Sequence, residues 1–113
     1  MRTDITVTAL TRAGVDPPAL TDADMTNGMR IPTNNGHVFV EIISSDAAPQ
    51  TVGFEIPKEI DGESVGDKTV TIPAGDTRLV GPFPPGDYNQ DDGSVYVNPS
   101  LDGATLQFRA YKV

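Results

Sequence analysis

The chain has 113 residues, a net charge of −8 and no cysteine, and these totals exclude several kinds of protein. The length is typical of one domain, so we expect a single domain over residues 1–113. Without cysteine, neither a disulfide framework nor a thiolate metal site can form. Sixteen acidic against eight basic residues repel phosphate backbones and anionic lipids, so we expect no nucleic-acid partner and no membrane partner.

Apolar and polar residues alternate in seven short segments, which is the pattern of half-buried β-strands. The segments are residues 5–9, 38–42, 52–56, 69–72, 77–80, 95–97 and 106–110. Clusters of glycine, proline, asparagine and aspartate separate them. About seven short strands with such turns predict an all-β fold, an antiparallel β-sandwich.

The alternation breaks over residues 11–36, which read TRAGVDPPALTDADMTNGMRIPTNNG. Prolines and asparagine–glycine pairs in this stretch favour turns over strands. A loop of this length in a compact domain usually has a function, so we predict a long loop or interaction arm. Within it, residues 19–25 suit a short helical turn.

Four residues of this segment, Met25, Met29, Arg30 and Ile31, form the candidate partner-binding set. Methionine is flexible and common at adaptable contact surfaces, and arginine is enriched at interfaces. The alternative is that these residues fix the loop onto the sandwich. The sequence leaves both interpretations open.

The stretch VTIPAGDTRLVGPFPPG, residues 70–86, combines β-branched residues with turn formers. PAGD suits a type II turn with Gly75 at the position that requires a positive φ, and we expect it to carry the chain between the two sheets. The prolines of GPFPPG cannot donate ladder hydrogen bonds. That segment is therefore predicted to run extended along a sheet edge with Phe83 turned inward. The connection KEIDGESVGDK before this stretch is expected to be a solvated loop.

Catalytic side chains are scarce in this sequence. The single histidine, His37, follows an asparagine–glycine pair at the start of a strand, where exposure or a local hydrogen bond is expected. No nucleophile motif accompanies it, so we expect a protein that is not an enzyme.

Asp87, Asn89 and Asp91 have the spacing of the first half of a calcium-binding loop. The loop glycine then comes one residue late, at Gly93, and the twelfth position is Asn98 instead of glutamate. A polar surface turn before a strand has the same composition, and it is the preferred interpretation. We therefore expect no metal and no cofactor.

Small β-sandwiches also serve as sugar-binding modules, which use exposed aromatic platforms. This chain has no tryptophan, and its candidate platforms are Tyr88, Tyr96 and Tyr111. Each tyrosine could equally pack against a neighbouring strand with its hydroxyl in water. A glycan-binding module therefore remains an alternative.

Several motifs together resemble a known family. TNG at residues 26–28, NNG leading into HVFVEI, and TVTIPAGDTRLVGPFPPGDYNQDDGSVYV are similar to small virion proteins encoded in the structural modules of tailed phages of actinobacteria. The resemblance covers residues 26–97 and is strongest over TVTIPAGDTRLVGPFPPGDYN, residues 69–89.

This resemblance implies a non-enzymatic head decoration protein. Its expected partner is the major capsid protein, with neighbouring copies of the chain as further partners. Its expected location is the exterior of the capsid in the virion, after assembly in the host cytoplasm, and it is expected to stabilise the shell. A minor tail or head–tail joining protein is the alternative within the same class.

Overall fold

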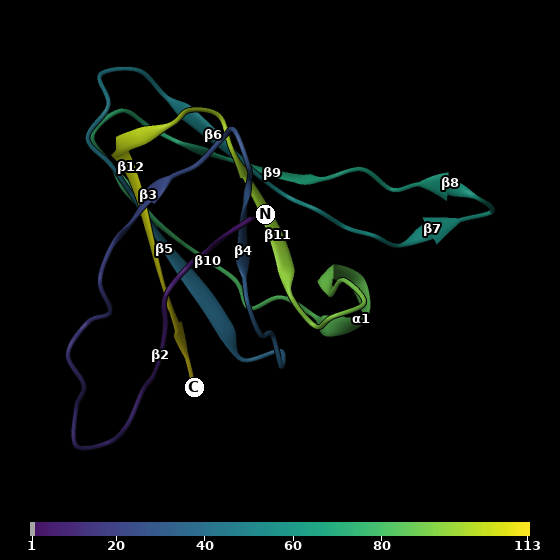
Figure 1. The fold of residues 1–113 in the computed structure, drawn as a ribbon, viewed down its shortest axis with the longest axis horizontal. Coiled ribbons are helices and arrows are strands. Elements are labelled where there is room, and N and C mark those ends of the chain that lie inside the picture. The colour runs from purple at the N-terminus through teal and green to yellow at the C-terminus, as the bar shows by residue number, and fades with distance from the viewer. Residues whose placement is uncertain (1) are drawn as a thin grey trace.

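The computed structural model describes residues 2–113, and its regular secondary structure is almost entirely β-strand, which confirms the all-β prediction (Figure 1). Sheet A has the strand order β1 (Thr3–Asp4), β4 (Met29–Ile31), β11 (Val95–Pro99), β6 (Gln50–Phe54) and β9 (Lys68–Ile72). Sheet B has the order β10 (Thr77–Val80), β5 (Val38–Ser44), β12 (Gly103–Lys112) and β2 (Val7–Ala9), with β3 (Thr21–Ala23) also paired to β12. The remaining elements are the paired strands β7 (Glu59–Ile60) and β8 (Glu63–Ser64) and the short helix α1 (Pro85–Tyr88).

Both sheets contribute to one hydrophobic core. The strands alternate, so that β5 buries Val38, Val40 and Ile42, while β12 buries Leu106, Phe108 and Ala110. From sheet A the same core receives Met29, Ile31, Val52, Phe54, Ile72, Val95 and Val97. Strands are present in all seven predicted segments. Alternation identified the buried face of most of them, because successive side chains of a strand point to opposite sides, but β2 and β10 contain no buried residue.

Two of the seven crossings that residues 2–113 make between the sheets lie near the N-terminus and at the predicted turn of residues 73–76. Near the N-terminus, β1 pairs with β4 in sheet A and β2 pairs with β12 in sheet B, with the buried Ile5 between them. These two pairings are parallel, whereas the other pairings in the described residues are antiparallel. The other of these two crossings is the predicted turn from β9 to β10, where Gly75 has a φ of 68° and Asp76 N donates to Pro73 O at 3.1 Å.

The proline-rich segment after β10 is only partly as predicted. Phe83 is buried in the core, as expected. The centroid of its ring lies 5.0 Å from the ring centroid of Phe54 and 5.3 Å from that of Tyr88. The extended conformation ends at Pro84, however, because Pro85 begins α1. Proline is favourable in the first turn of a helix, where its missing N–H has no partner to lose.

The prediction of a loop over residues 11–36 is wrong for its second half. This segment contains β3 and β4, and β4 lies between β1 and β11 inside sheet A. Residues 21–23 are extended and pair with β12, so the helical turn expected over residues 19–25 is absent. Three-residue strands give too little alternation to stand out between proline and glycine, and sheet pairing decides their conformation.

Candidate partner-binding surfaces

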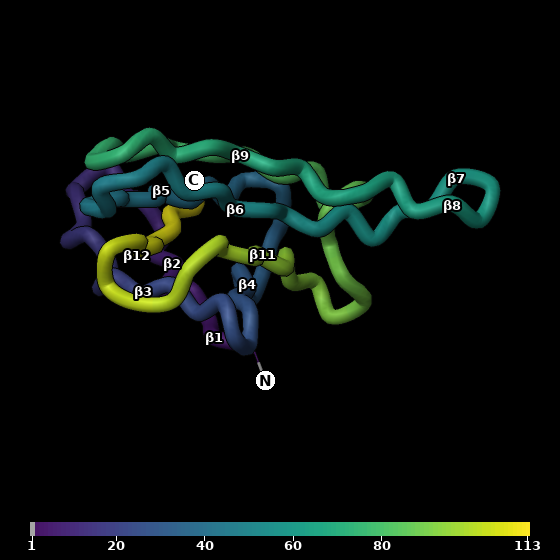
Figure 2. The backbone as a smooth tube through the Cα atoms, turned by 90° about the horizontal axis from the view of Figure 1, so that it is seen from above, coloured from purple at the N-terminus to yellow at the C-terminus, as the bar shows by residue number. Residues whose placement is uncertain are grey.

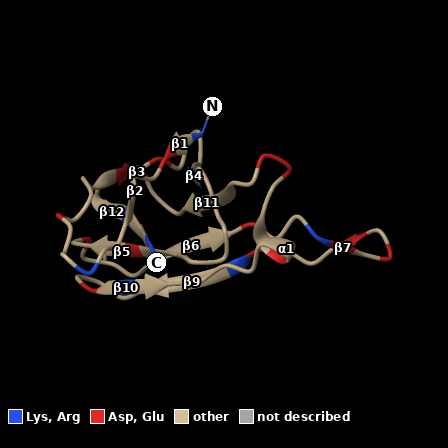
Figure 3. Ribbon diagram, turned by 90° about the horizontal axis from the view of Figure 1, so that it is seen from below, with Lys and Arg blue, Asp and Glu red and all other residues tan. Residues whose placement is uncertain are grey.

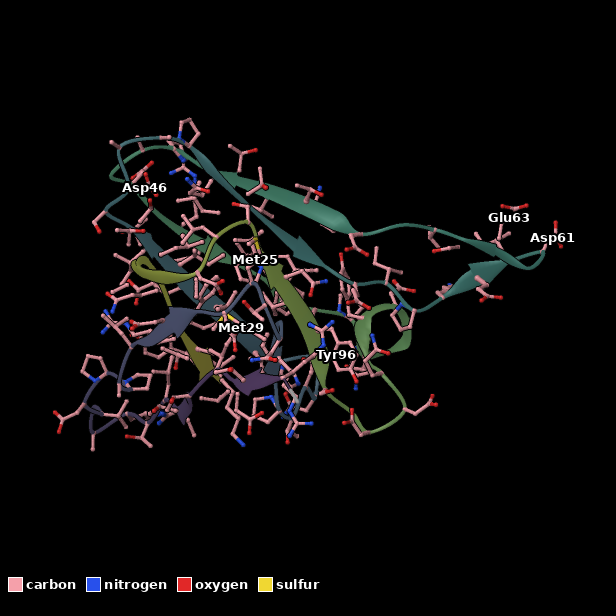
Figure 4. All side chains as sticks on the ribbon, turned by 45° about the horizontal axis from the view of Figure 1, so that its top comes forward. Met25, Met29, Asp46, Asp61, Glu63 and Tyr96 are labelled. Carbon is pink, nitrogen blue, oxygen red and sulfur yellow. The ribbon has the colours of Figure 1, made fainter. Side chains whose placement is uncertain are left out.

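Of the four residues predicted to bind a partner, the structure exposes Met25, partly exposes Arg30 and buries Met29 and Ile31. Figure 4 labels Met25 and Met29. The Met25 side chain is 53% exposed, and the partly exposed Arg30 forms ion pairs with two aspartates. Met29 and Ile31 have no exposed surface, because they are the inward positions of β4. The predicted set is therefore wrong for Met29 and Ile31, which pack in the core.

Hydrogen bonds to Asp24 and Asp102 hold the turn that carries Met25. Thr3 Oγ1 donates to Asp24 Oδ2 at 2.6 Å, and Asn27 N donates to Asp24 Oδ1 at 3.0 Å. These bonds hold the pKa of Asp24 below its usual value of 3.8, and the bond from Thr3 has the largest effect. On the other side, Met25 N donates to Asp102 Oδ1 at 2.5 Å.

The lowered pKa of Asp24 predicts a loss of stability in acid. A carboxyl with a depressed folded-state pKa stabilises the fold above its unfolded pKa, and the contribution is lost as the pH falls through the folded pKa. We expect the urea midpoint of the wild type to fall more steeply than that of Asp24→Asn between about pH 5 and pH 2. Asp91→Asn, at an exposed carboxylate, is the control and should follow the wild type. Parallel curves for the wild type and Asp24→Asn would contradict the prediction.

The three residues with calcium-loop spacing do not converge. Asp87 Oδ1 lies 3.3 Å from Lys58 Nζ, and Asn89 Oδ1 accepts from Asn34 Nδ2 at 2.7 Å, while Asp91 is exposed. Within residues 2–113, no group of three or more His, Asp or Glu side chains is placed to hold a metal ion. Asn89 instead links the α1 segment to Asn34. The structure therefore does not bring Asp87, Asn89 and Asp91 together as metal ligands.

The three tyrosines lie at separate places. Tyr88 packs against Phe83 at the margin of the core. Tyr96 projects outward from β11 in sheet A, between the buried Val95 and Val97, and Tyr111 projects outward from β12 in sheet B, next to the buried Ala110. The outward tyrosines therefore occupy opposite sheets and do not form one shared platform.

The outer face of sheet B has an apolar and aromatic centre. Register places Phe39 opposite Tyr111, Glu41 opposite Arg109, and Leu79 opposite Glu41. We call the outer residues of β5, β10 and β12 at this centre the B-face; they are Phe39, Glu41, Ile43, Leu79, Arg109 and Tyr111. Leu79 at the edge is 65% exposed. The B-face therefore presents apolar surface to solvent beside an ion pair.

The polar groups of the B-face neutralise one another. Arg109 Nε donates to Glu41 Oε1, and this bond is the main reason that the pKa of Arg109 is raised. The Tyr111 hydroxyl also donates to Glu41 Oε1, at 3.3 Å, and its ring stacks on Phe39 with centroids 5.4 Å apart. Burial first, and then the Glu41 carboxylate, raise the pKa of Tyr111 above 10.0. The centre of this face thus stays without net charge near neutral pH.

The outer face of sheet A is polar by contrast. Its outward residues on β6, β9, β11 and β4 are Thr51, Thr69, Thr71, Asn98, Tyr96 and Arg30. The Arg2 guanidinium covers its aromatic residue, with the carbon Cζ 4.0 Å from the centre of the Tyr96 ring. Arg2 also donates to Glu55 Oε2 at 2.8 Å and to Asn98 Oδ1 at 2.7 Å. These contacts engage the polar groups around Tyr96 from within the chain.

The connection between β6 and β9, expected as a solvated loop, is a projecting hairpin (Figures 1 and 2). We call residues 57–67, which include β7 and β8, the arm; all of them are exposed. Its turn is Asp61-Gly62, with φ values of 53° and 79°. Two positive φ values define a type I′ hairpin turn, and Asp-Gly is a strong sequence signal for it, so this hairpin could have been predicted.

His37 is exposed, as predicted, and its backbone N donates to Asn35 Oδ1 at 3.0 Å. Residues 2–113 form no detectable pocket, and no helix among them has the length and apolar character to cross a membrane. Comparison of the chain with protein-family models, with curated proteins and with solved structures finds no match. The candidate functional sites are therefore exposed surfaces such as the B-face and the arm.

Proposed function

We propose that the protein is a non-enzymatic virion structural protein, a decoration protein that binds the major capsid protein on the outside of the head and stabilises the shell. The observation that carries this proposal is the B-face, a sheet surface with an apolar and aromatic centre that remains partly exposed. Apolar side chains around a satisfied ion pair are typical of the centre of a protein interface. The resemblance over residues 26–97 supports the choice of a capsid as partner.

The charge of the chain also supports this role. A net charge of −8 on a component that faces outward makes particles repel one another. Binding repeated over a lattice further allows a modest affinity at each site, because contacts with several subunits add avidity.

The test uses head particles that lack the protein. Purified wild type should co-sediment with these shells and raise the temperature at which they disrupt. Leu79→Asp places a charge in the B-face, and we expect it to weaken shell binding about tenfold or more. Thr71→Asp, an exposed position on the outer face of sheet A, is the matched control and should bind like the wild type.

Two results would overturn this proposal. Failure of the wild type to bind any head particle would remove the capsid as partner. Equal binding by Leu79→Asp and the wild type would exclude the B-face as the surface that binds the shell. The number of copies per virion distinguishes a decoration protein from a minor tail or head–tail joining protein. Decoration requires many copies over the shell, whereas a head–tail joint holds a single small ring.

A further inference from the structure

The arm lies apart from the core and is fixed only at its base. Lys58 Nζ, near its start, lies 3.3 Å from Asp87 Oδ1 at α1, while β7 and β8 pair only with each other. In Figure 1 the arm extends to one end of the long axis of the molecule. A two-stranded hairpin gains little stability alone, so its projection as a formed hairpin suits a contact element better than a packing element.

The tip of the arm combines negative charge with apolar surface (Figure 3). Residues 59–64 contain the carboxylates Glu59, Asp61 and Glu63 and no lysine or arginine. Ile60 is 61% exposed and Val65 is 50% exposed. A matching surface would therefore be cationic with aliphatic side chains beside the charge.

The end of the molecule away from the arm carries exposed cations beside aliphatic side chains (Figure 1). Of the lysines and arginines in residues 2–113, Arg12, Lys68 and Lys112 form no ion pair, and Lys68 belongs to β9 at the arm. Arg12 lies in the loop after β2, and the bond from Leu10 N to Lys112 O at 2.8 Å joins that loop to the end of β12. We call residues 10–16 and Lys112 the basal end; its exposed charged and large apolar residues are Leu10, Arg12, Val15, Asp16 and Lys112.

We propose that the chain self-associates head to tail, with the arm of one copy docked on the basal end of the next. Ile60 and Val65 would pack against Leu10 and Val15, while Glu63, which shares their face of the hairpin, would face Arg12 and Lys112. Charge complementarity selects a second copy, because the tip of the arm, residues 59–64, carries three carboxylates without a cation, whereas the basal end carries the cations Arg12 and Lys112 beside the carboxylate of Asp16. The two surfaces differ, so the contact is heterologous and repeats into a ring or a chain.

The absence of cysteine allows a direct test by disulfide trapping in solution, without shells. One variant carries Ser64→Cys in the arm, and the other carries Ala13→Cys in the basal end. Both positions are exposed and uncharged, so neither change alters the proposed charges, and Ser64→Cys gives up only the hydrogen bond from Gly66 N to Ser64 Oγ at 3.3 Å. The mixture should form a Ser64→Cys to Ala13→Cys crosslink under mild oxidation. A mixture of Ser64→Cys with Thr71→Cys, on the outer face of sheet A, is the control for random collision.

Charge reversal then tests the chemistry of the contact. Adding Glu59→Lys and Glu63→Lys to the arm variant should reduce the crosslink to the yield of the control. Adding Arg12→Glu and Lys112→Glu to the basal variant should restore it with the reversed arm. About 0.5 M salt should weaken the original pair, because screening reduces attraction between exposed charges.

A crosslink yield in the mixture no higher than that of the control would overturn the proposal. A yield that charge reversal leaves unchanged would also overturn it. Tip-to-tip crosslinks in Ser64→Cys alone at the yield of the mixture would also overturn it, because they indicate a symmetric contact. None of these results bears on shell binding through the B-face.

Discussion

Replacement of Phe54 by alanine is expected to lower the free energy of unfolding by about 3–5 kcal/mol, the usual cost of removing a buried aromatic ring. Phe54 has no exposed surface, and its ring lies 5.0 Å from that of Phe83. Through Phe83 and then Tyr88 this contact holds the α1 segment against sheet A. The variant therefore loses both core volume and the attachment of a neighbouring segment, which is a large fraction of the about 5–15 kcal/mol typical of a domain.

Urea unfolding followed by far-UV circular dichroism measures this effect, since the chain has no tryptophan to report on the core. The control is Phe39→Ala, which removes the same ring from the outward side of β5, where it stacks on Tyr111. We expect a loss below about 1.5 kcal/mol there, the range of an aromatic pair at a surface. Equal losses for the two variants would contradict the assignment of Phe54 to the core.

Two methionines only four positions apart should respond very differently to the same substitution. Met29→Ala is expected to cost about 2–5 kcal/mol, because it leaves a cavity in the core next to a strand that has only three residues. Met25→Ala changes a side chain that is 53% exposed, and its effect should stay within about 0.5 kcal/mol.

The comparison of these variants tests the position of β4. Denaturation midpoints with an unchanged m-value give the two free-energy differences on the same scale. If Met25→Ala destabilised the protein as much as Met29→Ala, residues 29–31 would not lie in the sheet. A large difference would confirm that this part of the segment builds the core.

The longer strands could be predicted because their alternation extends over several residues. In β5 and β12 every second side chain is apolar, and the sequence alone identified Val40 and Phe108 as inward. The Pro73 to Asp76 turn was predictable for a local reason, since Gly75 supplies the positive φ. Strand β4 was missed because three residues surrounded by turn formers carry no period, and its place depends on pairing with β1 and β11.

The candidate surfaces depend on contacts that no local pattern contains. Phe39 was visible as the outward neighbour of Val38 and Val40, but its pairing with Tyr111 joins residues far apart in the chain. Arg30 and Met29 are adjacent in sequence, and only the sheet decides that one faces solvent and the other the core. The arm is the exception, because its Asp61-Gly62 turn was a local signal of a hairpin.

The parallel pairing of β2 with β12 has a consequence for how the protein is made. One of the first strands to leave the ribosome finds its partner in residues 110–112, so it cannot be ordered until the last strand has emerged. The core also waits for Leu106, Phe108 and Ala110. Folding should therefore begin only after residue 112 has emerged, and it should be slow for a domain of this size, since long-range pairings close large loops. A nascent chain stalled before residue 103 should remain sensitive to protease, and a nascent chain long enough to expose residue 112 outside the ribosome should become protected.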